Sequence, residues 1–155
     1  MGFSDAGAHL RNMAFYNMGL RLLRHVRDAQ QAGTPFMTVE AAVHRLTGEL
    51  ADWYRLDAGH LRVGDRADIA IIDPDHLDES LDAYAEEPVE QYGGLHRMVN
   101  RNDTTVSAVF VAGTAVFLDG EATPVVGTQR TGRFLRAAHK APAVAVREGA
   151  LARVG

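Results

Sequence analysis

The segment TTVSAVFVAGTAVFLDG, residues 104–120, constrains the fold more than any other part of the sequence. It is rich in Val, Phe and Thr, and Gly113 divides it into two runs. This pattern predicts two strands, 106–112 and 114–118, that are joined by a tight turn. A third apolar run, residues 67–72, predicts a further strand. Because a lone two-stranded ribbon is marginally stable in water, these strands need partners on their edges.

The sequence ahead of these strands predicts helices. Residues 14–32 repeat apolar side chains at helical spacing, which indicates one amphipathic helix that ends at Gly33. Thr38 is typical of a helix N-cap and begins a second helix. Thr47 and Gly48 interrupt the second pattern before it resumes, so we expect two short helices there.

The remaining parts of the chain show weaker patterns. Residues 76–102 are polar and acidic, and they predict a loop with a helical turn near 81–85. Gly93-Gly94 is too short a glycine motif for a phosphate-binding loop. Residues 137–155 mix small and charged side chains without a period, which indicates a poorly ordered tail.

Composition limits the function classes. A chain of 155 residues has room for about one domain. The net charge of −4 favours neither nucleic acid nor an anionic membrane as a partner, and the absence of cysteine excludes thiolate metal sites within the chain. The sequence has neither a long apolar run nor a signal-peptide pattern, so we expect a cytoplasmic protein.

Three segments, in this order, resemble the C-terminal part of the amidohydrolase superfamily. They are FSDAGAH at 3–9, TGELADWYRLDAGHLRVGDRADIAIIDP at 47–74, and VSAVFVAGTAVFLDG at 106–120. The middle segment is the most specific, because it carries the pattern TG..A....L..G.L..G..AD...iDP. SDAGAH followed by a long helix, together with TGRFLRA at 131–137, is most similar to the N-acyl-D-amino-acid deacylase (D-aminoacylase) group.

The resemblance implies an α/β fold class. It implies that the chain begins with the C-terminal fragment of a (β/α)8 TIM-type barrel, namely the last strand and helix of the barrel. This fragment would be followed by the C-terminal portion of a composite β-sandwich. The expected division is residues 1–56 for the end of the metal-dependent hydrolase barrel, 57–136 for the sandwich part and 137–155 for the tail.

The resemblance also implies a catalytic role for Asp5. In the family, the aspartate at this position touches a zinc-bound water, takes its proton and passes the proton to the leaving amine. Asp5 could therefore share a zinc with ligands outside the chain, since the chain has no His-x-His pair. His9 is a candidate for substrate binding. The alternatives are a turn carboxylate at Asp5 and a structural hydrogen bond at His9.

The function implied is hydrolysis of a non-peptide C–N amide bond, with small N-acyl-D-amino acids as substrates. We expect the isolated chain to be inactive, because the zinc ligands would lie mostly outside it. One alternative is a non-catalytic truncated or split-gene chain that completes another subunit, with an N-terminal barrel portion or another chain as partner. A second is another amidohydrolase branch, such as a dihydropyrimidinase, a hydantoinase or a deaminase.

Overall fold

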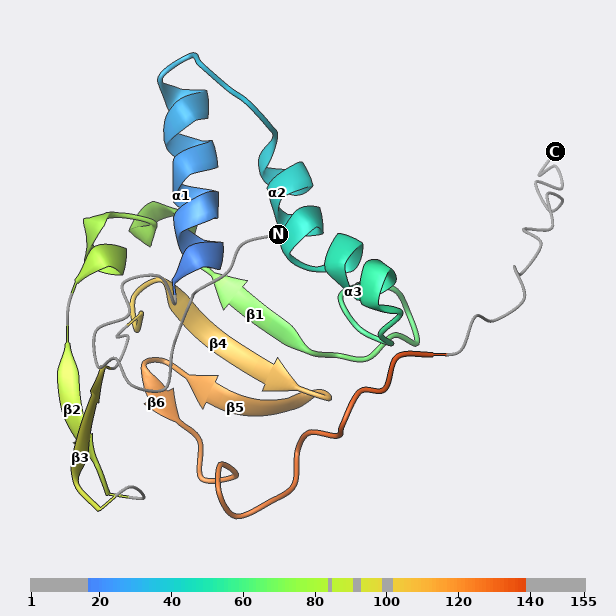
Figure 1. The fold of residues 1–155 in the computed structure, drawn as a ribbon, viewed down its shortest axis with the longest axis vertical. Helices are drawn as coiled ribbons and strands as arrows, with labels where there is room; N and C mark the ends of the chain where they lie inside the picture. Colours follow the sequence, from blue (N-terminus) through green and yellow to red (C-terminus); the bar gives the residue numbers. More distant parts are fainter. Residues whose placement is uncertain (1–16, 84, 91–92, 99–101, 139–155) are drawn as a thin grey trace, which may run out of the picture.

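Three helices precede the first strand in a computed structural model that describes residues 17–83, 85–90, 93–98 and 102–138 (Figure 1). They are α1 (Met18–Gln31), α2 (Val39–Leu46) and α3 (Gly48–Tyr54). The long helix and the two short helices that the sequence predicts are confirmed over these residues. Thr38 caps α2, since its Oγ1 accepts a hydrogen bond from the Ala41 N–H at 3.1 Å.

The three predicted strands, together with a short strand that was not predicted, β6, form one antiparallel sheet with the order β1-β4-β5-β6. The hairpin between β4 and β5 turns at Ala112 and Gly113, which have φ angles of 50° and 81°. Two successive positive φ angles match the type I′ turn that the twist of a hairpin favours. The bounds of the strands are Ile69–Ile72 for β1, Val106–Val111 for β4, Thr114–Leu118 for β5 and Glu121–Ala122 for β6.

The segment expected to be a loop, 76–102, contains a second hairpin. Strands β2 (Glu86–Val89) and β3 (Leu95–Met98) pair in antiparallel fashion, and Gly93 and Gly94 lie in the turn with positive φ angles. The loop prediction was therefore wrong for this part of the segment. Ahead of the hairpin lie two short 3-10 turns, Pro74–His76 and Glu79–Asp82.

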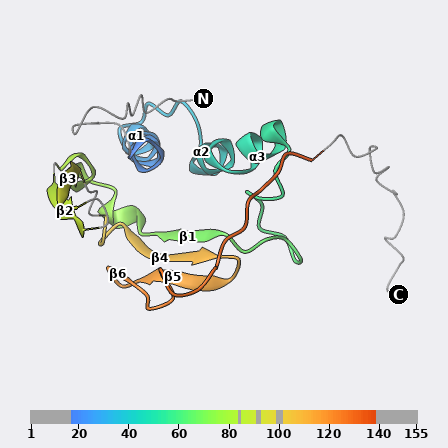
Figure 2. The ribbon, with the colours of Figure 1, turned by 60° about the horizontal axis from the view of Figure 1, so that its bottom comes forward.

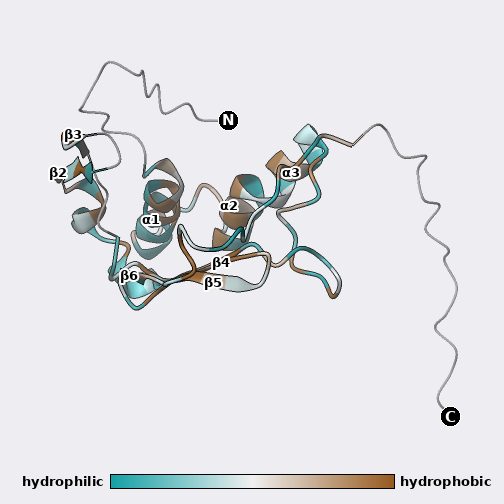
Figure 3. Cartoon of the chain, turned by 90° about the horizontal axis from the view of Figure 1, so that it is seen from below, coloured by the Kyte–Doolittle hydropathy of each residue, from teal (hydrophilic) through white to brown (hydrophobic). Residues whose placement is uncertain are grey.

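The core lies between the helices and the sheet. Figure 2 shows α1 and α2 on one face of the sheet, and Figure 3 shows hydrophobic stretches on α2 and α3. Residues from α1 and α2 pack against Leu77 and Leu81, so this packing crosses the expected boundary between residues 56 and 57. The buried members of this cluster are Leu23, Val26, Ala42, Leu77 and Leu81.

The expected fold class is contradicted. An α/β barrel fragment requires helices that alternate with parallel strands, whereas the described residues place three helices in succession and then pair every strand antiparallel. Within the described residues, α1 and α2 cover one face of the four-stranded sheet, and no second sheet packs on that face (Figure 2). The expected β-sandwich portion is therefore not found there either. The described part is an α+β arrangement. The segment FSDAGAH at 3–9, where the resemblance implies the end of the last barrel strand, lies outside the described residues.

Within the described residues, no helix is both long enough and apolar enough to cross a membrane. The longest, α1, has 14 residues and carries several arginines.

Candidate functional site

The two site residues that the sequence predicts, Asp5 and His9, lie outside the described residues. The structure therefore bears on two other features. One is the segment 47–74, which carries the most specific part of the family resemblance. The other is a groove between the helices and strand β1.

Gly59 allows the chain to cross directly over the start of α3. Its φ angle is +80°, and a Cβ built on it would lie 2.9 Å from the Ala51 Cβ and 2.9 Å from the carbonyl oxygen of Thr47. Such distances are shorter than real Cβ contacts, and the positive φ angle also favours glycine. Thr47, Ala51 and Gly59 belong to the pattern in segment 47–74. Their spacing is explained by the close crossing of the Gly59 backbone over α3.

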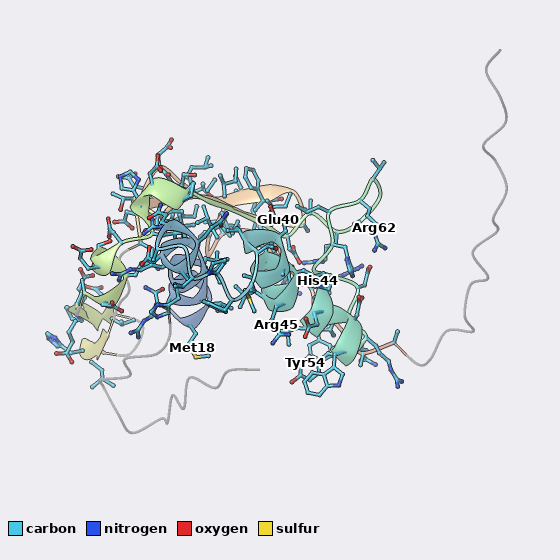
Figure 4. The ribbon with its side chains drawn as sticks, turned by 90° about the horizontal axis from the view of Figure 1, so that it is seen from above. Met18, Glu40, His44, Arg45, Tyr54 and Arg62 are labelled. Carbon is cyan, nitrogen blue, oxygen red and sulfur yellow. The ribbon has the colours of Figure 1, made fainter. Side chains whose placement is uncertain are left out.

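His60 follows the crossing and bonds back to α3. Its Nε2 lies 2.8 Å from Oδ1 of Asp52, and its ring packs over Gly48, where a Cβ would lie 2.9 Å from the ring Cε1. This hydrogen bond lowers the pKa of Asp52 below its ordinary value, and the nearby positive charges of Arg62 and His44 act in the same direction. Figure 4 shows His44 on α2 and Arg62 in the loop that follows α3.

The His60–Asp52 pair is a structural clamp. The Nδ1 edge of the ring faces Gly48, since a Cβ there would lie 3.2 Å from Nδ1. The Nε2 atom thereby bonds to a residue of α3, and the Nδ1 edge of the ring lies close to Gly48 of the same helix. The pair holds the loop of residues 57–68 against the helix.

The clamp predicts an effect of pH on stability. Folding lowers the pKa of Asp52 from its ordinary value of 3.8, so the pair stabilises the folded state above that pH and loses this effect as the pH falls through the folded-state pKa. We expect Asp52→Asn to unfold at a lower temperature than the wild type at about pH 7, and this gap to narrow as the pH falls below 3.8 through the lowered pKa of Asp52. Thermal unfolding followed by circular dichroism would measure it.

The control for this experiment is Asp75→Asn, which removes one exposed negative charge from the turn at Pro74–His76. A gap between the wild type and Asp52→Asn that remained the same from neutral to acidic pH would contradict the role of the ionised Asp52.

Asp68 joins the start of β1 to the β4–β5 turn. Its carboxylate accepts a hydrogen bond from the Ala112 N–H at 2.8 Å and forms an ion pair with Arg66. The Arg66 guanidinium, followed by the Ala112 N–H, lowers the pKa of Asp68. The sequence segments 47–74 and 106–120 are therefore bonded to each other at this point.

The groove between α1, α2 and β1 has a volume of about 430 Å³. Its apolar lining includes Leu20, Leu23, Val43, Leu46, Ile69 and Ile72. This volume is within the range of small-molecule sites, and such sites also carry polar groups that are free to orient a ligand.

The polar groups of the groove are already engaged. The Asn17 side chain donates to the Leu81 carbonyl at 2.9 Å and exchanges hydrogen bonds with Asn102. His60 bonds to Asp52, and Asp68 bonds to Arg66 and Ala112. Among the described residues that line the groove, these polar side chains are therefore bonded to other parts of the chain.

Zinc does not fit the described residues. Within the part of the chain that the structure describes, no three His, Asp or Glu side chains gather in a way that could hold a metal ion.

Comparisons with known proteins place the chain beside longer mycobacterial proteins. It is 62% identical over 146 residues to a protein described as uncharacterized from Mycobacterium bovis and, equally, to its counterparts in two strains of Mycobacterium tuberculosis. The match covers 88% of this chain and 23% of each relative, so the chain spans about a quarter of the length of these relatives. No family model matches the chain, and no solved structure matches it.

Sequence reasoning missed the Asp52–His60 pair. The two residues are eight positions apart, and α3 ends between them, so no repeat of a single helix or strand relates them. Their contact depends on the reversal at Arg55, whose φ angle of 57° ends α3. The strained backbone at a non-glycine residue carries no clear signal in the sequence.

Proposed function

We propose that the chain is the C-terminal portion of a zinc-dependent amidohydrolase that hydrolyses non-peptide C–N amide bonds, with N-acyl-D-amino acids as the substrate class. The proposal rests on one observation: the two longest segments that carry the family resemblance contact each other in the structure. Residues 47–74 and 106–120 meet through the β1–β4 pairing, in which Ile69 lies opposite Phe110, and through the bond from Ala112 to Asp68. The two segments that resemble the family therefore belong to one structural unit.

The length of the relatives also supports the proposal. The matched region is 23% of each mycobacterial protein, so most of their residues lie outside it and could supply the metal ligands that the described residues lack. In the proposed enzyme, the Asp5 carboxylate would take a proton from the water that adds to the amide carbon and would pass it to the amine that leaves as the C–N bond breaks. His9 would contact the substrate.

A chimera tests the proposal: the M. tuberculosis relative with its matched region replaced by this chain. We expect the purified chimera to hold zinc and to release D-amino acids from N-acyl-D-amino acids, and the isolated chain to do neither. Asp5→Asn in the chimera should lose turnover, because an amide cannot take up the proton, and a loss of zinc in the same variant would show that Asp5 is also a ligand. Asp75→Asn, on an exposed turn, serves as the matched control and should keep both.

Each other outcome has a defined meaning. Turnover of a dihydropyrimidine, a hydantoin or a deaminase substrate in place of an N-acyl-D-amino acid would assign the chain to another amidohydrolase branch. A folded chimera that binds no zinc and turns over none of these compounds would contradict the proposal and favour a non-catalytic subunit. The proposed location is the cytoplasm, and cell fractionation would test it.

A further inference from the structure

On the basis of the proposed function, we propose that Asn17 is a positioning residue, which fixes the point where the segment carrying Asp5 and His9 enters α1. Asn17 directly precedes α1, and residues 1–16 are joined to the described part of the chain through its peptide bond. The place of Asn17 in the fold therefore sets one end of that segment.

The side chain of Asn17 is not used to cap the helix. An asparagine at this position usually accepts a hydrogen bond from a backbone N–H of the first turn. The Asn17 side chain makes no such bond, and the first turn of α1 carries no acidic residue. The helix thus begins without the local interactions that commonly stabilise a helix start. The amide group is bonded elsewhere.

The Asn17 amide bonds to two segments that are distant in the sequence. Its Nδ2 donates to the Leu81 carbonyl at 2.9 Å and to Oδ1 of Asn102 at 3.0 Å, and its Oδ1 accepts from Nδ2 of Asn102 at 3.0 Å. Both amide hydrogens are therefore used. Asn17 is only 8% exposed, so water cannot easily replace these bonds when the side chain is removed.

Asn102 is itself fixed to the start of the sheet. Its carbonyl accepts from the Thr105 N–H at 3.0 Å and from the N–H of Val106, the first residue of β4, at 2.7 Å. Thr105 is fully buried, and its hydroxyl donates to the His76 carbonyl. The Asn17–Asn102 pair thereby joins the start of α1 to the start of β4 (Figure 1).

Other polar contacts hold α1 to residues 74–82 further along the helix. Arg24 forms an ion pair with Asp82 at 3.1 Å, and Arg27 donates to the Pro74 carbonyl at 2.8 Å. These contacts are exposed, and solvent weakens exposed ion pairs. Arg24→Gln therefore loosens the same packing without removing a bond of Asn17, which makes it a matched control.

Steady-state kinetics of the chimera described above tests the role of Asn17. We expect Asn17→Ala to lower kcat, measured per zinc-loaded molecule, at least roughly tenfold, because a small displacement of a catalytic group strongly lowers the rate. The KM should change less than kcat, since Asp5 acts on the reacting atoms. Arg24→Gln should keep the wild-type kcat.

Asn102→Ala is the milder variant, because it retains the bond from Asn17 to Leu81. It should lower kcat less than Asn17→Ala, and the double variant should lose no more than Asn17→Ala alone, since both substitutions remove the same pair. If Asn17→Ala does not fold, an undiminished kcat in Asn102→Ala would overturn the proposal.

The kinetic outcomes separate this role from the proposed function. An active wild-type chimera with an equally active Asn17→Ala would overturn only the positioning role. An equal fall of kcat in Arg24→Gln would do the same, because any loosening of α1 would then suffice. A wild-type chimera without turnover would overturn both.

Hydrogen exchange provides a measurement that does not use activity. The Arg21 N–H donates to the Asn17 carbonyl at 3.0 Å. We expect the Arg21 amide to exchange at least roughly tenfold faster in Asn17→Ala than in the wild type, with a smaller change at Val26 in the middle of α1. Equal changes at Arg21 and Val26, or none at Arg21, would contradict a role of Asn17 at the helix start.

Discussion

Gly59→Ala should destabilise the folded chain by roughly 2–5 kcal/mol. The added methyl group is unfavourable for two reasons, the backbone conformation and the lack of space. The φ angle of +80° is unfavourable for any residue with a Cβ, and that Cβ would lie 2.9 Å from the Ala51 side chain and from the Thr47 backbone. Relief would require the loop of residues 57–68 to move away from α3, which would also break the His60–Asp52 bond. Chemical denaturation followed by circular dichroism would measure the change.

Gly33→Ala is the matched control for Gly59→Ala. Gly33 also has a positive φ angle, +72°, but a Cβ built on it meets no atom within 4 Å. It should therefore cost only the conformational part, about 1 kcal/mol. Equal losses for the two variants would show that the close crossing at Gly59 contributes nothing to stability.

Leu23→Ala should destabilise the chain by about 2–5 kcal/mol. Leu23 is 6% exposed and belongs to the cluster that joins α1 to Leu77 and Leu81. Its truncation removes buried apolar contacts and leaves a cavity beside the existing groove, which Leu23 also lines. The free energy of unfolding from urea titration is the appropriate measurement.

Leu61→Ala provides the comparison for this experiment. It deletes the same atoms from a side chain that is 79% exposed, so the change should stay within about 0.5 kcal/mol. If Leu23→Ala were as mild as Leu61→Ala, the cluster around Leu23 would not be the core that holds the helices to the rest of the chain.

Local patterns in the sequence correctly predicted the helices α1 to α3 and the hairpin of β4 and β5. Thr38 caps α2 through a bond within its own first turn, and Gly113 completes the turn between β4 and β5. Such features depend on a few neighbouring residues, so their physical cause is present in the sequence itself. The hairpin of β2 and β3 was missed because its strands are short and rich in charged residues, although Gly93-Gly94 is a known turn signal.

The fold class could not be predicted in the same way. The helices and strands were expected in nearly the correct places, but the α/β barrel fragment was inferred from the resemblance and not from the pairing of the strands. Whether two strands run parallel or antiparallel depends on contacts between distant residues, such as Ile69 with Phe110. The described sheet is antiparallel throughout.

The sequence by itself indicated α1, α2, α3 and the strands β1, β4 and β5, because caps, turns and apolar periodicity act over a few residues. Only the tertiary structure decided that His60 would bond to Asp52, that Asp68 would bond to Ala112, and that β1 would have one open edge in the described residues. These contacts join residues that the chain reversal at Arg55 or the sheet brings together. Their energies depend on distance in space, which separation along the sequence does not specify.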